Sequence, residues 1–255
     1  MAVVWLASYP RSGNTWLRFL LYNYLHGEVV ESDDVNRRIP DIHKLALEEV
    51  VDRGELTLYK THLAAGPNHP LIQRTRGFIY VLCHPRDVLI SALNFMRMTG
   101  QFSGDDRTYA ERFIQTMGEP AWTRLGYANW LGHVASWLAA AHNFPHAFLR
   151  YERLKADPMT ELSAALRVLD MEVDEARLAR AIEGASFERM RGLEDKESKA
   201  GDQSAVFSLR GGEDRALRHV RQGKTGQSLE PLGEGLDEVF DRRFEMILSL
   251  LGYPL

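Results

Sequence analysis

The sequence predicts an α/β fold with a central, mostly parallel sheet flanked by helices. Short apolar runs alternate along the chain with longer segments whose apolar residues recur every three or four positions, a pattern typical of strands joined by helical crossovers. The first apolar run also leads into a helical pattern through a loop suited to phosphate. With 255 residues, the chain can bury roughly three quarters of its unfolded surface, so we expect a single domain over residues 1–255.

Four short apolar segments are predicted to be strands. They are Val3–Leu6, Leu56–Lys60, Phe78–Cys83 and Ala147–Tyr151. Because helical segments separate them, the strands should be connected by crossovers and pair in parallel. Loops at the carboxyl ends of such strands gather at one edge of the sheet, where α/β proteins bind their ligands. We therefore expect the loops at Pro10, His62 and Pro85 to lie together.

Three further helices have start or stop signals in the sequence. One is expected over Asp87–Arg97. A second should begin at Pro158, since proline is favoured in the first turn and Asp157 can cap it. The last carries apolar residues at three- and four-residue steps from position 236 to position 251, and Gly252 should end it.

The loop after the first strand is the most informative segment of the chain. Between strand and helix lie Pro10, Gly13, two hydroxyl side chains and the fixed positive charge of Arg11. The first N–H groups of a helix have no partner within the helix, and the helix dipole adds partial positive charge. An anion can therefore bind there with few side chains, and we expect a ligand that carries phosphate. A strand-to-helix turn without a ligand is the alternative for so short a motif.

This loop does not match the phosphate-binding loop of common ATP and GTP hydrolases. That motif needs two glycines five positions apart, followed by lysine and then serine or threonine, and only Gly13 is present. The segment Gly223-Lys224-Thr225 fails as well, because Arg218 stands where the first glycine belongs. An ordinary ATP or GTP hydrolase is therefore disfavoured.

Composition narrows the class of protein further. The hydrophobic fraction of 45% and the charged fraction of 26% are ordinary for a soluble protein. The only cysteine, Cys83, excludes an intramolecular disulfide and a site with several cysteine ligands, so we predict no metal site and a cytoplasmic location. The first residues lack a basic leader and no apolar run is long enough to span a bilayer, which argues against membrane insertion.

Charge is unevenly distributed along the chain. The formal net charge of −4 argues against a nucleic-acid partner. Residues 210–224 are nevertheless basic, with four arginines, one lysine and one histidine against two carboxylates. Most short charge runs are solvated loops or helix faces, but the glycines of this one favour a loop that wraps an anion.

Five segments, in order along the chain, resemble motifs of the sulfotransferases that use 3′-phosphoadenosine 5′-phosphosulfate (PAPS). Tyr9–Trp16 is similar to that family's 5′-phosphosulfate-binding loop, and Tyr59–Leu63 to the Lys-Thr-His-Leu segment that bears its catalytic base. Tyr80–Ser91 resembles its 3′-phosphate-binding strand and helix start. Phe148–Lys155 resembles its Arg-Tyr-Glu-Asp-Leu-Lys signature, and Arg221–Gly226 the start of its C-terminal Arg-Lys-Gly-x-x-Gly loop.

The resemblance implies a donor that is held at both of its phosphate-bearing ends and a reaction that requires no metal. The residues of the first loop that would bind the 5′ end are Arg11, Ser12, Gly13, Asn14, Thr15 and Trp16. The residues implied for the 3′-phosphate are Ser91, Arg221 and Gly223, with Gln222 and Tyr151 counted among the donor-binding residues because they lie in matching motifs. Trp16 and Phe187 match positions that flank adenine, with core packing as the alternative for both.

The resemblance also implies that His62 is the general base, which takes a proton from the acceptor hydroxyl as sulfur is attacked. Lys60, near the oxygen that bridges to sulfur, and Arg11 are the other predicted catalytic residues. An imidazole can accept that proton near neutral pH without large tuning of its pKa. A surface or structural role is the default for any one of nine histidines, but His62 follows a predicted strand and lies close to Lys60.

Three departures from the family pattern concern the donor site. Arg11 stands in place of the usual lysine, Cys83 in place of a 3′-phosphate arginine, and Gln227-Ser228 in place of Asp-Trp. His84, Arg86 or the basic segment would have to supply the cation that Cys83 lacks. These changes bear on donor affinity more than on the fold.

The leading hypothesis is transfer of a sulfuryl group from PAPS to a hydroxyl of a small-molecule acceptor. The alternatives are an ATP-dependent kinase-like enzyme with P-loop architecture, and a catalytically weak adenine-nucleotide-binding protein of the same fold, which the change at Cys83 favours. The acceptor pocket is expected between Asp33–Gly54 and Gln101–Gly126, although the aromatic side chains there could equally form a helical core. Sequence leaves the acceptor open, and also whether the protein is a monomer or a homodimer.

Overall fold

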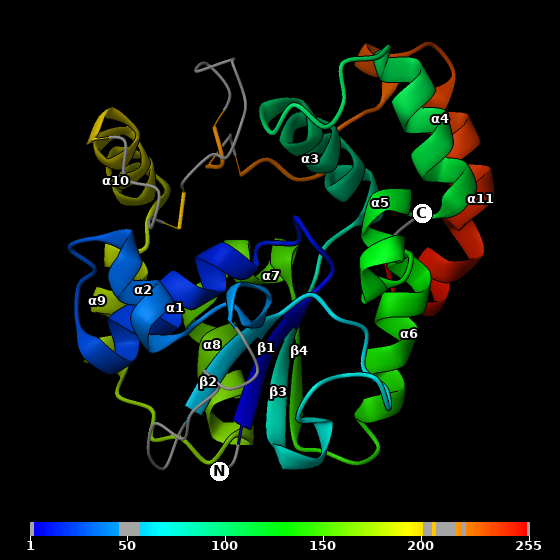
Figure 1. The fold of residues 1–255 in the computed structure, drawn as a ribbon. Coiled ribbons are helices and arrows are strands. Elements are labelled where there is room, and N and C mark those ends of the chain that lie inside the picture. The colour runs from blue at the N-terminus through cyan, green and yellow to red at the C-terminus, as the bar shows by residue number, and fades with distance from the viewer. Residues whose placement is uncertain (1–2, 46–56, 201–205, 208–217, 221–222, 254–255) are drawn as a thin grey trace.

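The protein has a four-stranded sheet in which every described pair of neighbours is parallel. The computed structural model describes residues 3–45, 57–200, 206–207, 218–220 and 223–253. The strands are β1 (Val3–Ser8), β2 (Thr57–Thr61), β3 (Thr75–Leu82) and β4 (His146–Arg150), in the order β2-β1-β3-β4 (Figure 1). The predicted α/β fold with helices around a parallel sheet is therefore confirmed.

Helices occupy most of the remaining described chain. They are α1 (Asn14–His26), α2 (Ser32–Arg38), α3 (Pro85–Met98), α4 (Asp106–Thr116), α5 (Pro120–Trp122), α6 (Trp130–Ala140), α7 (Tyr151–Ala156), α8 (Pro158–Val168), α9 (Glu175–Gly184), α10 (Phe187–Ala200) and α11 (Leu236–Leu250). Short helical turns also form over Ile42–Lys44, Ile72–Arg74, Thr123–Tyr127 and Glu230–Leu232. The three helices expected from their start or stop signals are all present, as α3, α8 and α11.

Capping side chains explain where two of these helices begin. Helix α3 starts two residues before the predicted Asp87, because the side chain of His84 accepts a hydrogen bond from the backbone N–H of Arg86 at 3.2 Å. Helix α8 starts at Pro158 as predicted, and the Asp157 carboxylate accepts from the N–H of Thr160 at 3.1 Å. Such caps satisfy N–H groups that the first turn leaves without partners.

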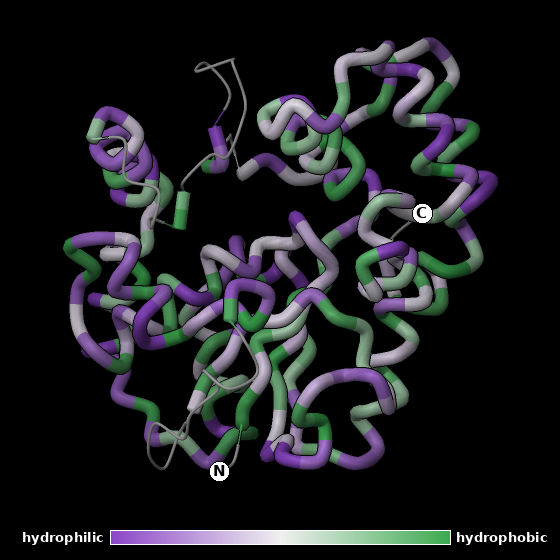
Figure 2. The backbone as a smooth tube through the Cα atoms, in the orientation of Figure 1, coloured by the Kyte–Doolittle hydropathy of each residue, from purple (hydrophilic) through white to green (hydrophobic). Residues whose placement is uncertain are grey.

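The two faces of the sheet bury different sets of side chains. Successive residues of a strand point to opposite faces, so Trp5 and Tyr80 lie on one face while Leu6 and Val81 lie on the other. The first face packs against α3, α4, α6 and α11, and the second against α1, α8 and α9. Figure 2 shows hydrophobic segments concentrated in the sheet between these layers. The interior strands are therefore covered on both sides, as parallel sheets require.

Candidate functional site

The loops that follow β1, β2 and β3 lie together at the carboxyl edge of the sheet. The ring of His62, just after β2, makes a 2.7 Å contact through Nδ1 with the carbonyl oxygen of Ser8, at the end of β1. Arg11, in the loop after β1, donates from Nε to the hydroxyl of Ser91 on α3 at 3.1 Å. The expectation that these three loops gather is confirmed.

The loop from Arg11 to Trp16 leaves the first turn of α1 without a side-chain cap among the described residues. Gly13 has a φ of +96°, a left-handed conformation that favours glycine. Among the described residues no side chain caps α1, and its first turn carries no carboxylate. The hydroxyl of Ser12 is buried without a described hydrogen-bond partner. Asn14 instead holds the loop to the sheet, donating from Nδ2 to the Leu6 carbonyl at 2.9 Å.

Arg11 links this loop to two distant segments. Besides Ser91, its guanidinium lies 3.3 Å from Nδ1 of His219 and donates to the His219 carbonyl at 3.2 Å. It also lies 5.1 Å from the centre of the Phe95 ring, within cation–π range. Sequence reasoning counted His219 only as part of a basic run. Its place beside Arg11 depends on long-range folding, and no local signal marks it.

His62 is held on several sides by other polar groups. Its N–H donates to Nε2 of His43 at 2.8 Å, and the two rings stack with centroids 5.8 Å apart. Its carbonyl accepts from Nε2 of the buried His133 at 3.1 Å, and the Tyr80 hydroxyl makes a 2.8 Å bond with Nδ1 of that same ring. Burial, and then the charge of Lys60, lower the pKa of His62 well below its ordinary value. The ring is therefore neutral at pH 7.

Lys60 forms an ion pair inside the site. Its Nζ lies 2.5 Å from Oδ2 of Asp41, and only 12% of each side chain is exposed. Burial lowers the pKa of Lys60, and the Asp41 carboxylate opposes that shift. Burial on its own would raise the pKa of Asp41, but Lys60, His43 and His62 together lower it far below its usual range. Asp41 and His43 belong to the site although sequence reasoning did not single them out.

The aromatic residues expected around adenine lie close to one another. Trp16 meets Tyr151 edge-on with ring centroids 5.8 Å apart, and its Nε1 donates to the Ala185 carbonyl at 2.9 Å. A Cβ added at Gly223 would lie 3.6 Å from the Tyr151 hydroxyl and 3.9 Å from the ring of Phe187. Phe187 is 41% exposed, so it is not a core residue. Arg221 and Gln222 lie outside the described residues.

Among the described residues, the charged neighbours of Cys83 are carboxylates. The ligand atoms of Cys83, Asp87 and Glu152 are all within 4.8 Å of one another. Burial and the neighbouring Glu152 raise the pKa of the Cys83 thiol. Arg86, which sequence offered as a compensating cation, instead pairs with Asp241 on α11 and lies over the Phe240 ring. His84, the other side chain offered, caps α3 and packs against Phe240 and Tyr253.

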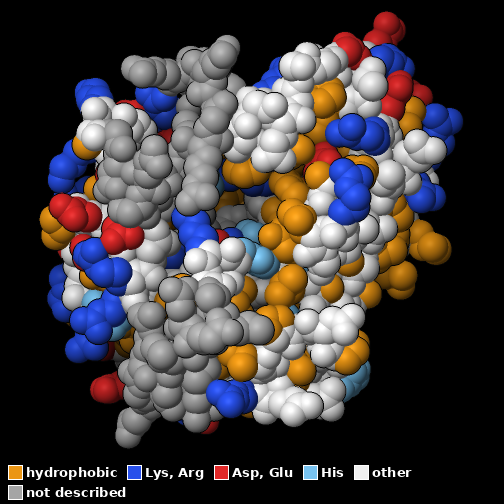
Figure 3. All heavy atoms as spheres, in the orientation of Figure 1, with side chains coloured by type: hydrophobic (Ala, Val, Ile, Leu, Met, Phe, Trp, Pro, Cys, Tyr) orange, Lys and Arg blue, Asp and Glu red, His pale blue; other side chains and the backbone are white. Residues whose placement is uncertain are grey.

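The region expected to hold the acceptor divides into two parts. Tyr109, Phe113 and Trp122 are buried in the core beneath α4 and α5, so the helical-core alternative is right for them. Tyr127 instead reaches the site, where its hydroxyl lies 3.3 Å from Nδ1 of His43. Figure 3 shows histidine side chains at the floor of a hollow on this face, bordered by hydrophobic side chains. Residues 46–54 lie outside the described part of the chain.

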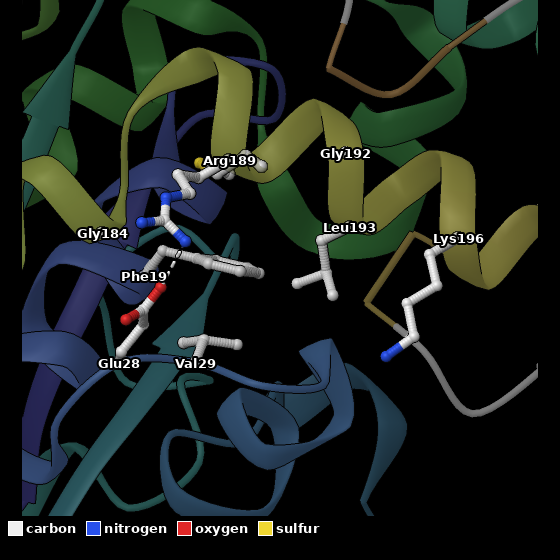
Figure 4. A pocket seen from close by; sticks show the side chains of 9 residues that line it. Phe19, Glu28, Val29, Gly184, Arg189, Gly192, Leu193 and Lys196 are labelled. Carbon is white, nitrogen blue, oxygen red and sulfur yellow. Dashed lines mark hydrogen bonds and ion pairs between the residues drawn. The ribbon is translucent and has the colours of Figure 1, made fainter.

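A separate cavity of about 180 Å³ lies between the end of α1 and α10 (Figure 4). Its lining includes Phe19, Val29 and Leu193, with the ion pair between Arg189 and Glu28 at 2.7 Å along one side. None of the predicted site residues lines it. The cavity therefore does not bear on the chemistry expected at the sheet edge.

The fold and this edge define an α/β protein with an uncapped helix N-terminus after its first strand and a neutral histidine after its second. The chain belongs to the sulfotransferase domain family, whose family model matches residues 2–250. Within the described residues, no helix combines the length and apolar character needed to cross a membrane.

Named relatives agree with this family. Residues of this chain are 29% identical over 199 positions to Sulfotransferase 1A1 of Canis lupus familiaris, and 27% identical over 205 positions to Sulfotransferase 1B1 of Mus musculus. Each alignment covers 73% of this chain but only 65% and 64% of those relatives, which is less than two thirds of their length.

Solved structures share the fold. Mouse sulfotransferase SULT7A1 complexed with PAP superposes with a TM-score of 0.65 at 20% identity, covering 95% of this chain and 84% of that one. Retinol dehydratase in a complex with retinol and PAP gives a TM-score of 0.68 at 18% identity, covering 99% of this chain and 82% of that one.

Proposed function

We propose that this protein transfers the sulfuryl group of PAPS to a hydroxyl of a small-molecule acceptor, with His62 as the general base. Family membership supports the reaction class. The observation that carries the mechanism is the 2.7 Å contact between His62 Nδ1 and the Ser8 carbonyl. A carbonyl can only accept, so Nδ1 must hold the proton, and Nε2 is then the nitrogen with a free lone pair.

The surroundings of His62 suit a base that must begin the reaction without a proton. Its lowered pKa keeps the ring neutral at pH 7, and the contacts with Ser8, His43 and His133 fix its orientation. When an acceptor hydroxyl attacks sulfur, its proton passes to Nε2. The new bond joins the acceptor oxygen to sulfur, and the bond that breaks joins sulfur to the 5′-phosphate oxygen, which leaves as adenosine 3′,5′-bisphosphate (PAP).

The loop at Arg11–Trp16 fits the 5′ end of the donor. Its helix N-terminus, the buried Ser12 hydroxyl without a described partner, and Thr15 offer donors to a phosphate. Trp16, Tyr151 and Phe187 offer aromatic surface for adenine. Ser91 and Gly223, with Arg221 and Gln222, are proposed for the 3′-phosphate.

Positive charge is proposed to stabilise the leaving oxygen. Transfer of a sulfuryl group resembles phosphoryl transfer in relying on positioning and electrostatics more than on covalent help from the protein. Arg11 and Lys60 are the cations proposed for this role. Because Lys60 already pairs with Asp41, it would share its ammonium between that carboxylate and the donor.

Substitution of His62 tests this proposal. His62→Ala should still bind PAP but lose about 10²- to 10⁴-fold in turnover, the usual contribution of a general base. Binding is read as thermal stabilisation, since a ligand at 100 times its Kd adds roughly 2.7 kcal/mol. His142→Ala, an exposed histidine in the turn after α6, is the matched control and should keep normal turnover.

Three outcomes would contradict the proposal. Near-normal turnover in His62→Ala removes His62 from the mechanism. Stabilisation by ATP with Mg²⁺ but not by PAP favours the kinase-like alternative. Binding of PAP without any product heavier by roughly 80 daltons across a broad acceptor panel, the mass of SO₃ added where the base removed a proton, favours a nucleotide-binding protein without turnover.

A further inference from the structure

His219 is a titratable residue that the mechanism above does not use, and its ring lies against the loop Arg11–Trp16. Its Nε2 is 3.2 Å from the hydroxyl of Thr15, and its two ring nitrogens are 3.3 and 3.4 Å from Nη1 of Arg11. An anion held by Arg11 and Thr15 would therefore lie against this ring.

The backbone around His219 is fixed by other elements. The N–H groups of His219 and Val220 donate to the two oxygens of the buried Glu194 on α10, at 2.6 and 2.9 Å. The carbonyl of Arg218 accepts from Asn94 on α3 at 3.4 Å, and the Arg218 side chain pairs with Asp195 at 3.0 Å. The ring itself packs against Phe207 with centroids 5.8 Å apart. His219 is thus held over the loop by contacts with both α3 and α10.

Among the described residues, the charges that act on the His219 ring are mainly positive. Arg11 comes from the loop after β1, Lys60 from β2, Lys44 from the turn after α2 and Arg18 from α1, and each lowers the pKa of His219 in addition to burial. Of the described carboxylates, that of Glu194 lies beside His219, and it bonds the backbone N–H instead of the ring. A guanidinium only donates, so at least one of the two ring nitrogens beside Arg11 is unprotonated. The ring is neutral while no anion offsets these cations.

We propose that His219 is a donor-binding residue that gains a proton when the 5′-terminal anion of the nucleotide binds beside Arg11 and Thr15. This inference rests on the proposed donor site and assigns that site a pH dependence. An anion offsets the positive field around the ring and accepts an N–H from it, and both effects favour imidazolium. Since the bound form holds an extra proton, affinity rises as pH falls through the bound-state pKa of His219.

Calorimetric titration with PAP tests the proton directly. Wild type, His219→Gln and His142→Gln are titrated at pH 6.5 and 8.0, each in two buffers with different heats of ionisation. The phosphates of PAP titrate near pH 6 themselves, but their contribution is common to all three proteins and cancels in the comparison. At pH 6.5, wild type and His142→Gln should take up about half a proton or more beyond His219→Gln. Their affinity should gain about twofold or more, relative to that variant, between pH 8.0 and 6.5.

The possible results distinguish this inference from the proposed function on which it rests. Equal proton uptake and equal pH dependence in wild type and His219→Gln overturn the role of His219 while leaving the donor site in place. No binding of PAP to wild type overturns both. If His219→Gln does not fold, His219→Phe replaces it, because phenylalanine keeps the packing against Phe207 and removes both ring nitrogens.

Discussion

At the scale of single residues, Gly13 determines whether the anion loop can form. Its φ of +96° places it in the left-handed region, and the Tyr151 ring lies directly over it, so an added Cβ would come within 2.7 Å of Tyr151 Cε2. Gly235, just before α11, is also left-handed, with φ +75° and ψ 4° against φ +96° and ψ 11° at Gly13, but nothing lies within 4 Å of an added Cβ there. The two glycines share a left-handed backbone and differ in crowding.

Alanine substitutions at these two positions separate the two effects. Gly235→Ala should lower the free energy of unfolding by about 1 kcal/mol, the cost of a left-handed conformation for a residue with a Cβ. Gly13→Ala should add the cost of displacing Tyr151, for a total of about 3 kcal/mol, and should also weaken PAP binding. Urea denaturation and thermal shift measure both. Equal losses in the two variants would mean that Tyr151 does not constrain the loop.

The residue scale also shows what sequence could and could not predict about the site. Arg11 and His62 follow strands, Lys60 lies near the end of β2, and Ser91 lies in the second turn of α3. Their motifs therefore place them near the carboxyl edge of the sheet. Asp41 and His43 reach Lys60 and His62 from a short turn that carries no motif. The pairing of buried charges from different segments depends on tertiary packing, so local sequence patterns do not predict it.

At the scale of elements, Asp87 joins the first turn of α3 to the loop that contains Gly223. Its Oδ2 accepts from the Gly226 N–H at 2.9 Å and its Oδ1 from the Gln227 N–H at 3.1 Å. This loop is also where Gln227-Ser228 departs from the usual family residues. The carboxylate therefore anchors a segment proposed to bind the 3′-phosphate.

Asp87→Asn should weaken the attachment of this loop to α3. An asparagine has one accepting oxygen, so its amide group would face one of the two N–H donors, at a cost of about 1–3 kcal/mol in the free energy of unfolding. PAP binding should weaken several-fold while turnover at saturation changes little. Asp174→Asn is the control, since Asp174 is a partly exposed cap of α9 and asparagine caps a helix equally well. Unchanged PAP affinity in Asp87→Asn would show that the loop is held by other contacts.

Element boundaries followed the sequence only in part. Strand β3 ends at Leu82, one residue before the predicted Cys83, and Tyr151, predicted to end the last strand, begins α7. Strand β3 begins at Thr75, three residues before the predicted start, because Thr75 pairs with Val3 and its hydroxyl accepts from Trp5 Nε1 at 2.9 Å. Neither Thr75 nor Arg76 is apolar, so hydrophobic pattern alone could not include them. The strand order β2-β1-β3-β4 could not be predicted from the sequence either, since it depends on which distant strands pair.

At the scale of the whole molecule, histidines in the fully packed interior link global stability to pH. His133 has no exposed surface and His69 is 4% exposed. Burial is the main cause in both, and it lowers the pKa of His69 to about 4 and that of His133 to about 3. The Tyr80 hydroxyl and the His62 carbonyl hold the neutral ring of His133. Both rings are therefore neutral in the folded protein at pH values where they would be charged in the unfolded chain.

Stability should accordingly fall as the solution becomes acidic. The unfolded chain binds protons at these histidines near pH 6.5, whereas the folded protein does not until about pH 4 or below. Because the unfolded state holds more protons in that window, each histidine removes stability as pH drops through it, roughly 2 kcal/mol by pH 5.

Urea unfolding at intervals from pH 7.5 to 5 should show this loss of stability. In His69→Gln, the free energy of unfolding lost between pH 7.5 and 5 should be smaller by about the contribution of one histidine, whatever the variant's stability at pH 7.5. His142→Gln should lose as much as the wild type over the same range. An unchanged slope in His69→Gln would mean that this imidazole already binds its proton in the folded core.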